Sequence, residues 1–291
     1  MRGLALLALL LAPALAQVRT AATLSLLADL VAQVGGGRVR VVSLVPPGAD
    51  PHTYEPRPSA ALALETAQAL FANGLGLEPY LPRLEALLPK GARVVRLAEG
   101  QPDLICGLLG LREKGVHLHG DCDPHLWLDP AYALGYAERI AQVLGELDPK
   151  GVPLYRGRLA ALRERVLEED RALSACLKGK GLRVAATHLS LLYFARRYGV
   201  EVVSTLMDAH AQEAGPRSRL ALLKEAEAGR LDLFLAEPQF PRVQAEALAR
   251  ELGVPLAVVY TDALDGRVPT YLDLLRHNRE ALCEAVKGLR R

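Results

Sequence analysis

Short apolar runs alternate with amphipathic segments in the first and last parts of the chain. Apolar runs bounded by turn residues predict strands, and apolar residues spaced three and four apart predict helices. The predicted strands span residues 18–23, 38–45, 68–74 and 92–98 in the first part, and 182–187, 200–206, 231–237 and 255–261 in the last. Helical patterns separate them, and this alternation favours an α/β fold with parallel sheets.

The middle of the chain has only helical patterns. Residues 131–148 show apolar spacing of three and four, and the pair Asp148-Pro149 interrupts the pattern. Residues 154–179 then form one long, highly charged amphipathic segment. We expect this segment to be a rigid connector between two halves of the protein. Periodicity alone equally allows a surface helix inside a single domain.

The first residues have the features of a signal peptide. Arg2 is basic, residues 3–12 are apolar but too short to span a bilayer, and the small residues Ala14 and Ala16 form a cleavage pattern before Gln17. We expect export to the periplasm or another compartment outside the cytoplasm. The predicted segments are a signal peptide (1–16), an N-terminal α/β lobe (17–148), a linker helix (149–179) and a C-terminal α/β lobe (180–291).

Composition fits a globular protein that binds neither nucleic acid nor an acidic membrane surface. Hydrophobic residues make up 51% of the chain and charged residues 23%, which is enough apolar material for a core. The formal net charge is only +2, and lysine and arginine form no stripe. We expect a monomer with no nucleic-acid partner.

Four cysteines become candidate disulfides if the protein is exported, because oxidising compartments favour the bond. A bridge between Cys106 and Cys122 would close the loop between them. Cys176 and Cys283 lie near the ends of two predicted helices and can pair with each other. Four cysteines allow three pairings, so the sequence leaves the choice open. The absence of a C-x-x-C spacing argues against a structural zinc site.

Three histidines and one aspartate fall where α/β sheets bind ligands. His188 ends a predicted strand, Asp262 follows another, and His52 and His125 lie in loops of the first half. Open parallel sheets bind ligands beyond the carboxyl ends of their strands, so these side chains can converge in one cleft. Each residue also has an ordinary alternative role, as a solvated turn histidine, a ring against Trp127, or a turn or capping residue.

Three imidazoles and one carboxylate suit a divalent transition metal. Zinc takes histidine and aspartate ligands in a tetrahedral shell, and manganese accepts mixed nitrogen and oxygen ligands with higher coordination. The residues alone therefore predict a site for Zn²⁺ or Mn²⁺. The imidazoles must be neutral to bind, so affinity should fall as the pH drops.

The loops around these candidates carry further polar residues. His117 and His119 lie in a loop with no apolar periodicity, where they would capture metal loosely or simply be solvated. Around His125, we expect Trp127 and Leu128 to anchor the segment in the core. Asp123 and Asp129 flank prolines and are predicted to be turn residues, and Cys122 to be structural.

Six segments carry a resemblance to a known family. They are "VPPGADPHTYEPRPS", "FANGLGLE", "GDCDPHLWLDP", "ATHLSLLYFARRYG", "LFLAEP" and "YTDALDG", in this order. Together they resemble the metal-binding solute receptors of zinc and manganese ABC importers, known as cluster A-I or cluster 9. The likeness covers nearly the whole chain after the predicted signal peptide.

The resemblance implies two α/β lobes joined by one long rigid helix, with a metal held between them. The family's three histidines fall on His52, His125 and His188, and its carboxylate falls on Asp262. Family members with glutamate at the third position are associated with manganese, so His188 favours zinc, with Mn²⁺ as the alternative, or a receptor for both zinc and manganese. The resemblance also implies a receptor that delivers its ion to an ABC-importer membrane permease and catalyses no reaction.

Two other functions remain open at this point. A secreted zinc-dependent hydrolase would need a general base, and Glu55 or Glu237 would serve only if it reached the site. The sequence has neither an H-E-x-x-H helix nor a G-x-S-x-G turn. A receptor for an organic solute would use the histidines as hydrogen-bond donors, but an aromatic content of 5% offers little for stacking a sugar.

Overall fold

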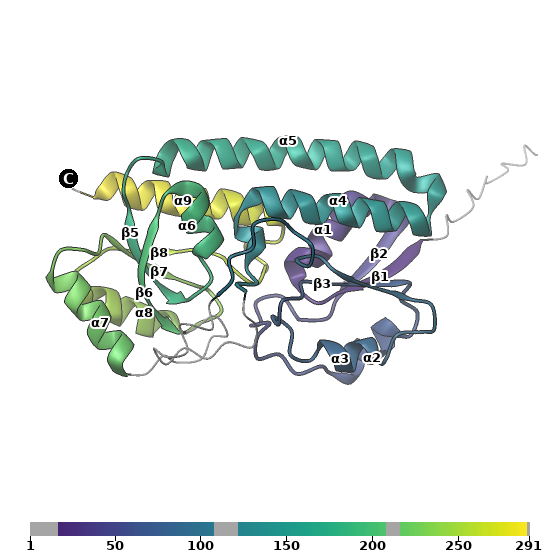
Figure 1. The fold of residues 1–291 in the computed structure, drawn as a ribbon, viewed down its shortest axis with the longest axis horizontal. Coiled ribbons are helices and arrows are strands. Elements are labelled where there is room, and N and C mark those ends of the chain that lie inside the picture. The colour runs from purple at the N-terminus through teal and green to yellow at the C-terminus, as the bar shows by residue number, and fades with distance from the viewer. Residues whose placement is uncertain (1–16, 108–121, 208–215, 290–291) are drawn as a thin grey trace, which may run out of the picture.

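Two four-stranded sheets form the framework of the protein (Figure 1). The computed structural model describes residues 17–107, 122–207 and 216–289. The strand orders are β2-β1-β3-β4 and β6-β5-β7-β8, and all neighbouring strands pair in parallel. The predicted α/β fold with parallel sheets is confirmed.

Each half of the chain contributes one sheet and the helices that cover it. The strands are β1 Val18–Ala22, β2 Val39–Ser43, β3 Ala69–Ala72, β4 Arg93–Arg96, β5 Arg183–His188, β6 Glu201–Met207, β7 Leu233–Ala236 and β8 Leu256–Val258. The helices are α1 Ser25–Gly35, α2 Pro58–Leu64, α3 Leu81–Glu85, α4 Pro130–Leu147, α5 Val152–Leu177, α6 Leu192–Tyr198, α7 Pro216–Glu227, α8 Arg242–Leu252 and α9 Tyr271–Gly288. These elements fall where the apolar patterns predict them, with differences at their ends.

The last strand, β8, is shorter than predicted, and one side chain of α9 explains why. The strand ends at Val258, and the last bond to β7 is the one from the Val259 N–H to the Ala236 carbonyl at 2.9 Å. Asn278 of α9 then bonds the backbone of Tyr260, accepting from its N–H and donating to its carbonyl, each at 2.8 Å. Because these groups are satisfied by a side chain, they need no neighbouring strand. The following residues are thus turned toward the space between the two sheets.

One hydrophobic core extends through both halves. It includes buried residues of α1, α4, α5 and α9 and residues from both sheets. Two smaller clusters lie on the other faces, under α2 and α3 in the first half and under α7 and α8 in the second. In Figure 1, α5 runs along the top of the molecule above α4 and α9. The halves therefore share packed helices as well as a chain connection.

Helix α5 contacts both halves along its length. It packs against α1 and α4 of the first half and against α9 of the second. At its start, the Tyr155 hydroxyl donates to Asp148 at 2.7 Å, and Arg38 pairs with the same carboxylate at 2.6 Å. The hydrogen bond from Arg38 holds the pKa of Asp148 at about 2. These contacts favour a connector over a surface helix inside a single domain, while the boundaries of the segments stay a prediction.

Both proposed disulfides are present. Cys106 is bonded to Cys122, and Cys176 of α5 is bonded to Cys283 of α9. The second bridge joins the linker helix to the last helix of the chain.

Some sequence predictions lie outside the described residues. They are the signal peptide over residues 1–16 and the histidines His117 and His119. Within the described ranges, none of the helices combines the length and hydropathy needed to cross a bilayer.

Replacing both Cys176 and Cys283 with alanine should lower the free energy of unfolding. The bridge spans a sequence separation of 107 residues, and loop-closure entropy assigns about 4–5 kcal/mol to a loop of that size. Urea denaturation monitored by circular dichroism measures the decrease in the free energy of unfolding. The matched pair Cys106→Ala and Cys122→Ala, with a separation of 16, should lose less, about 3 kcal/mol. Equal stability of wild-type protein with and without reductant would contradict this expectation.

Candidate metal centre

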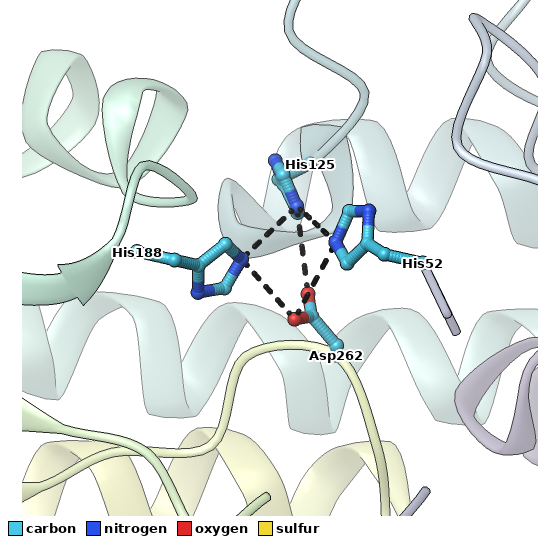
Figure 2. A group of neighbouring side chains, drawn as sticks. All are labelled: His52, His125, His188 and Asp262. Carbon is cyan, nitrogen blue, oxygen red and sulfur yellow. Dashed lines mark hydrogen bonds and ion pairs between the residues drawn. The ribbon is translucent and has the colours of Figure 1, made fainter. Parts of the chain in front are cut away.

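Four side chains from four separate segments meet between the two sheets (Figure 2). They are His52, His125, His188 and Asp262, and one ligand atom from each lies within 4.8 Å of all the others. None of these side chains is more than 1% exposed. The structure thus brings together the whole set of candidate residues from the sequence.

The separations between the ligand atoms suit a small cation. The Nε2 atom of His125 lies 3.3 Å from Nε2 of His52 and 3.4 Å from Nε2 of His188. Asp262 places Oδ2 at 3.2 Å from His188 Nε2 and 3.8 Å from His52 Nε2, and Oδ1 at 3.6 Å from His125 Nε2. A tetrahedral zinc site with bonds of about 2.0–2.1 Å has ligand–ligand edges of about 3.3–3.4 Å.

Asp123 fixes the orientation of the His125 ring. The Oδ1 atom of Asp123 lies 2.7 Å from His125 Nδ1 and also accepts from the His125 backbone N–H at 3.0 Å. An ionised carboxylate only accepts hydrogen bonds, so the ring proton belongs on Nδ1. In the neutral ring, the Nε2 lone pair then faces the cluster.

Glu237 does the same for His188. It follows β7 directly, and its Oε1 atom lies 2.8 Å from His188 Nδ1. Its other oxygen accepts from the Thr261 hydroxyl and from the Gln239 amide. The His188 proton is therefore also assigned to Nδ1, and its Nε2 lone pair points toward the same space.

His52 is placed by a turn that repeats the one at His125. The backbone N–H of His52 donates to Asp50 Oδ1 at 2.9 Å, and the Thr53 hydroxyl donates to Asp50 Oδ2 at 2.9 Å. In both Asp-Pro-His triplets, the aspartate side chain accepts from the histidine backbone two residues later. The repeated triplet is a sequence signal for this placement.

The charged groups of the cluster shift one another's pKa values. Burial raises the pKa of Asp262, but the neighbouring histidines, His188 first, outweigh it and hold that pKa below its usual value. Burial lowers the pKa of His188, but the charges of Glu237 and Asp262 outweigh it and hold that pKa well above its usual value. Either a proton on His188 or a bound metal cation would supply the positive charge that stabilises these two carboxylates.

The "FANGLGLE" segment supports the cluster from the first sheet. Asn73 follows β3, and its amide donates to the Pro124 carbonyl at 2.9 Å, directly before His125. Glu78 in turn accepts from the backbone N–H groups of Asn73 and Gly74 at 2.7 and 3.0 Å. Gly74 has a φ of 87°, which a residue with a side chain rarely adopts. Sequence reasoning had not assigned these residues a role at the site.

Trp127 joins the segment that carries His125 to the segment that carries Asp262. It lies in a short 3₁₀ helix, Leu126–Leu128, and is fully buried. Its indole N–H donates to the Thr261 carbonyl at 2.6 Å, and its own carbonyl accepts from the Tyr271 hydroxyl at 2.7 Å. The prediction that Trp127 and Leu128 anchor this segment is confirmed, because both are buried.

The two aspartates beside Trp127 have different roles. Asp129 caps α4 and accepts from the Ala131 N–H at 2.9 Å, as expected of a turn residue. Asp123 also forms the predicted turn, through the His125 backbone N–H, but it is fully buried and contacts the His125 ring, a role that the sequence did not predict.

The candidate bases of the hydrolase alternative are not free at the site. Glu55 is exposed and pairs with Arg83 at 3.4 Å. Glu237 reaches the cluster but is bonded to His188, Thr261 and Gln239. Neither glutamate therefore places a carboxylate that is free to act as a general base beside the four-residue cluster.

Comparison with known proteins identifies the family. Residues 21–285 match the family described as ZnuA, zinc-uptake complex component A, periplasmic. The chain belongs to this family. Its members are metal-binding receptors of ABC importers, and they are not enzymes.

Relatives with manganese in their names are similar over most of the chain. The manganese-binding lipoprotein MntA of Halalkalibacterium halodurans is 29% identical over 265 residues, which cover 87% of this chain and 83% of MntA. The manganese ABC transporter substrate-binding lipoprotein PsaA of Streptococcus pneumoniae is 25% identical over 280 residues, which cover 93% and 89%.

Solved structures share the fold. A crystal structure of ZnuA has a TM-score of 0.75 and 28% identity, and the match covers 93% of this chain and 98% of that one. A manganese-bound periplasmic metal-binding protein from Candidatus Liberibacter asiaticus has a TM-score of 0.78 at 21% identity, with coverage of 92% and 98%. At that identity the likeness supports the fold alone.

Replacing Trp127 with phenylalanine should destabilise the protein. The change removes the donor to the Thr261 carbonyl, and a buried acceptor left without a partner costs about 1–3 kcal/mol, to which the lost volume adds. Urea denaturation followed by circular dichroism measures the effect. Tyr54→Phe is the control, because the Tyr54 hydroxyl only accepts a long 3.4 Å bond from Arg57. Equal unfolding midpoints for the two variants would contradict the proposed link.

Proposed function

We propose that this receptor holds one divalent ion with His52, His125, His188 and Asp262, and that Zn²⁺ is favoured over Mn²⁺. The observation that carries the proposal is the orientation of the rings. The Nδ1 atoms of His125 and His188 each contact a carboxylate, so their Nε2 lone pairs face one point beside Asp262. Lone pairs that converge in a buried space repel one another unless a proton or a metal cation lies between them.

The donor set supports zinc. Three imidazole nitrogens and one carboxylate oxygen complete a tetrahedral shell, and the separations of 3.2–3.8 Å are close to its edges. A nitrogen-rich site binds zinc more tightly than manganese whatever ion is transported. MntA and PsaA carry manganese in their names, so Mn²⁺ remains the second candidate cargo.

Four protein ligands argue against the hydrolase. A catalytic zinc normally keeps one position open for water and needs a base nearby. With four donors the shell would be closed, and Glu237 is already engaged by His188. The burial of all four side chains likewise favours an ion over an organic solute.

The complete proposal includes export, delivery and release. The signal peptide over residues 1–16 would direct the chain out of the cytoplasm, and the mature receptor would act as a monomer that delivers its ion to an ABC-importer membrane permease. Helix α5 is packed against both halves, which limits hinge closure. We therefore place release in local movement of the loops that carry His52 and Asp262.

Purified protein should contain about one metal ion per chain. The variants His125→Ala and Asp262→Ala should each contain no bound metal. Each change removes one of four ligands, and removal of Asp262 also leaves three imidazoles without their counter-charge. Inductively coupled plasma mass spectrometry measures the number of metal ions per chain. His277→Ala is the control, because the His277 ring contacts the Val258 carbonyl and lies outside the cluster.

The wild-type melting temperature should also rise on addition of Zn²⁺, because an ion that binds only the folded state stabilises it. A metal-free protein whose melting temperature is unchanged by Zn²⁺ and by Mn²⁺ would contradict the proposal.

The apparent affinity for Zn²⁺ should fall as the pH is lowered from about 8 to about 5.5. The imidazoles ligate only when neutral, and the raised pKa of His188 means that a proton competes with the metal up to a higher pH than for a free histidine. Titration calorimetry in buffers of different ionisation enthalpy should detect proton release on binding. An affinity that is independent of pH over this range, with no proton release, would contradict the assignment of histidine ligands.

A further inference from the structure

We propose that Gln239 holds Asp262 as a ligand through one oxygen and thereby favours Zn²⁺ over Mn²⁺. This inference rests on the proposed function, because it concerns the selectivity of the same site. It assigns a role to a residue that is not itself among the four candidate ligands.

The Gln239 amide lies at the centre of three acceptors. The residue belongs to the loop between β7 and α8 and is half-buried. Its Nε2 atom lies 3.0 Å from Glu237 Oε2, 3.1 Å from Thr261 Oγ1 and 3.1 Å from Asp262 Oδ2. One side chain thus connects the carboxylate that orients His188 with the carboxylate of the cluster.

The direction of these hydrogen bonds follows from chemistry. Glu237 and Asp262 offer only acceptors when ionised, so the nitrogen of the Gln239 amide, and not its oxygen, must face them. The contact to Asp262 is therefore a hydrogen bond from a neutral donor to a charged acceptor, the stronger class of hydrogen bond.

The two oxygens of Asp262 are consequently unlike. Oδ2 accepts from Gln239 and lies 3.2 Å from His188 Nε2 and 3.8 Å from His52 Nε2. Oδ1 is buried and has no hydrogen-bond partner among the described residues, and its contact with His125 Nε2 is 3.6 Å. Each carboxylate oxygen has two acceptor sites, so Oδ1 keeps both of its sites for an ion, whereas Oδ2 has given one of its sites to Gln239.

A carboxylate held through one oxygen suits zinc better than manganese. One oxygen and three nitrogens fill the four positions that zinc prefers. Manganese favours oxygen ligands and a higher coordination number, which a bidentate carboxylate would help to supply. By engaging Oδ2, Gln239 opposes the bidentate mode and lowers the affinity for Mn²⁺ relative to Zn²⁺.

The test compares Gln239→Met with Thr261→Val. Gln239→Met keeps the length of the side chain and removes its donors. Thr261→Val removes a hydroxyl that donates to Glu237 and accepts from Gln239, but it leaves the Gln239–Asp262 contact itself in place. Dissociation constants for Zn²⁺ and Mn²⁺ come from chelator competition, and the visible spectrum of bound Co²⁺ reports the coordination number, since four-coordinate Co²⁺ absorbs far more strongly than six-coordinate Co²⁺.

Gln239→Met should lower the Zn²⁺/Mn²⁺ affinity ratio by roughly tenfold, within the effect typical of residues that orient a metal ligand. Its Co²⁺ bands should weaken. Gln239→Glu, which removes the donors and adds an oxygen, should shift the ratio at least as far. Thr261→Val should change both affinities equally and leave the Co²⁺ spectrum as in the wild type.

Equal losses for both metals in Gln239→Met, with an unchanged Co²⁺ spectrum, would overturn the inference, as would the same ratio shift in Thr261→Val. These outcomes differ from failure of the proposed function, in which the wild-type protein itself binds none of the three ions.

Discussion

Asp262 puts a carboxylate in a buried space where its neighbours are three imidazoles and one amide. Removal of charge from water is costly unless the charge is paired, so this carboxylate needs positive charge close by. A proton on His188 meets that need in part, as the raised pKa of His188 shows. A divalent ion would meet it more fully and would also separate the Nε2 lone pairs. Most of the surrounding structure acts to keep these groups together.

The residues around the cluster fix its geometry from both sheets. Asp123 and Glu237 each hold a histidine ring by its Nδ1 atom. The indole of Trp127 bonds the Thr261 carbonyl next to Asp262, so the segment from the first half is tied directly to the segment from the second. Helix α5 packs against both halves and limits how far they can separate. The site is thus held by hydrogen bonds close to it and by helix packing at a distance.

The sequence was sufficient to predict the fold class and the meeting of the four candidate residues. Apolar runs bounded by turn residues predict the strands, and apolar residues spaced three and four apart predict the helices. The carboxyl ends of parallel strands indicate where His188 and Asp262 lie. The roles of Asn73, Glu237 and Gln239 could not be predicted in this way. Their hydrogen bonds depend on how loops from different strands approach one another, which periodicity does not encode. The contact of Asp123 with the His125 ring was also not predicted, although the Asp-Pro-His triplet that contains Asp123 repeats the one at His52.

The central claim is that one ion lies among four side chains contributed by both halves of the chain. Anomalous diffraction from crystals of the zinc-loaded protein, measured on both sides of the zinc absorption edge, tests it most directly. The account predicts a single strong anomalous peak bonded to the Nε2 atoms of His52, His125 and His188 and to Asp262. A peak located elsewhere, or no peak at this cluster in crystals that contain stoichiometric zinc, would contradict it.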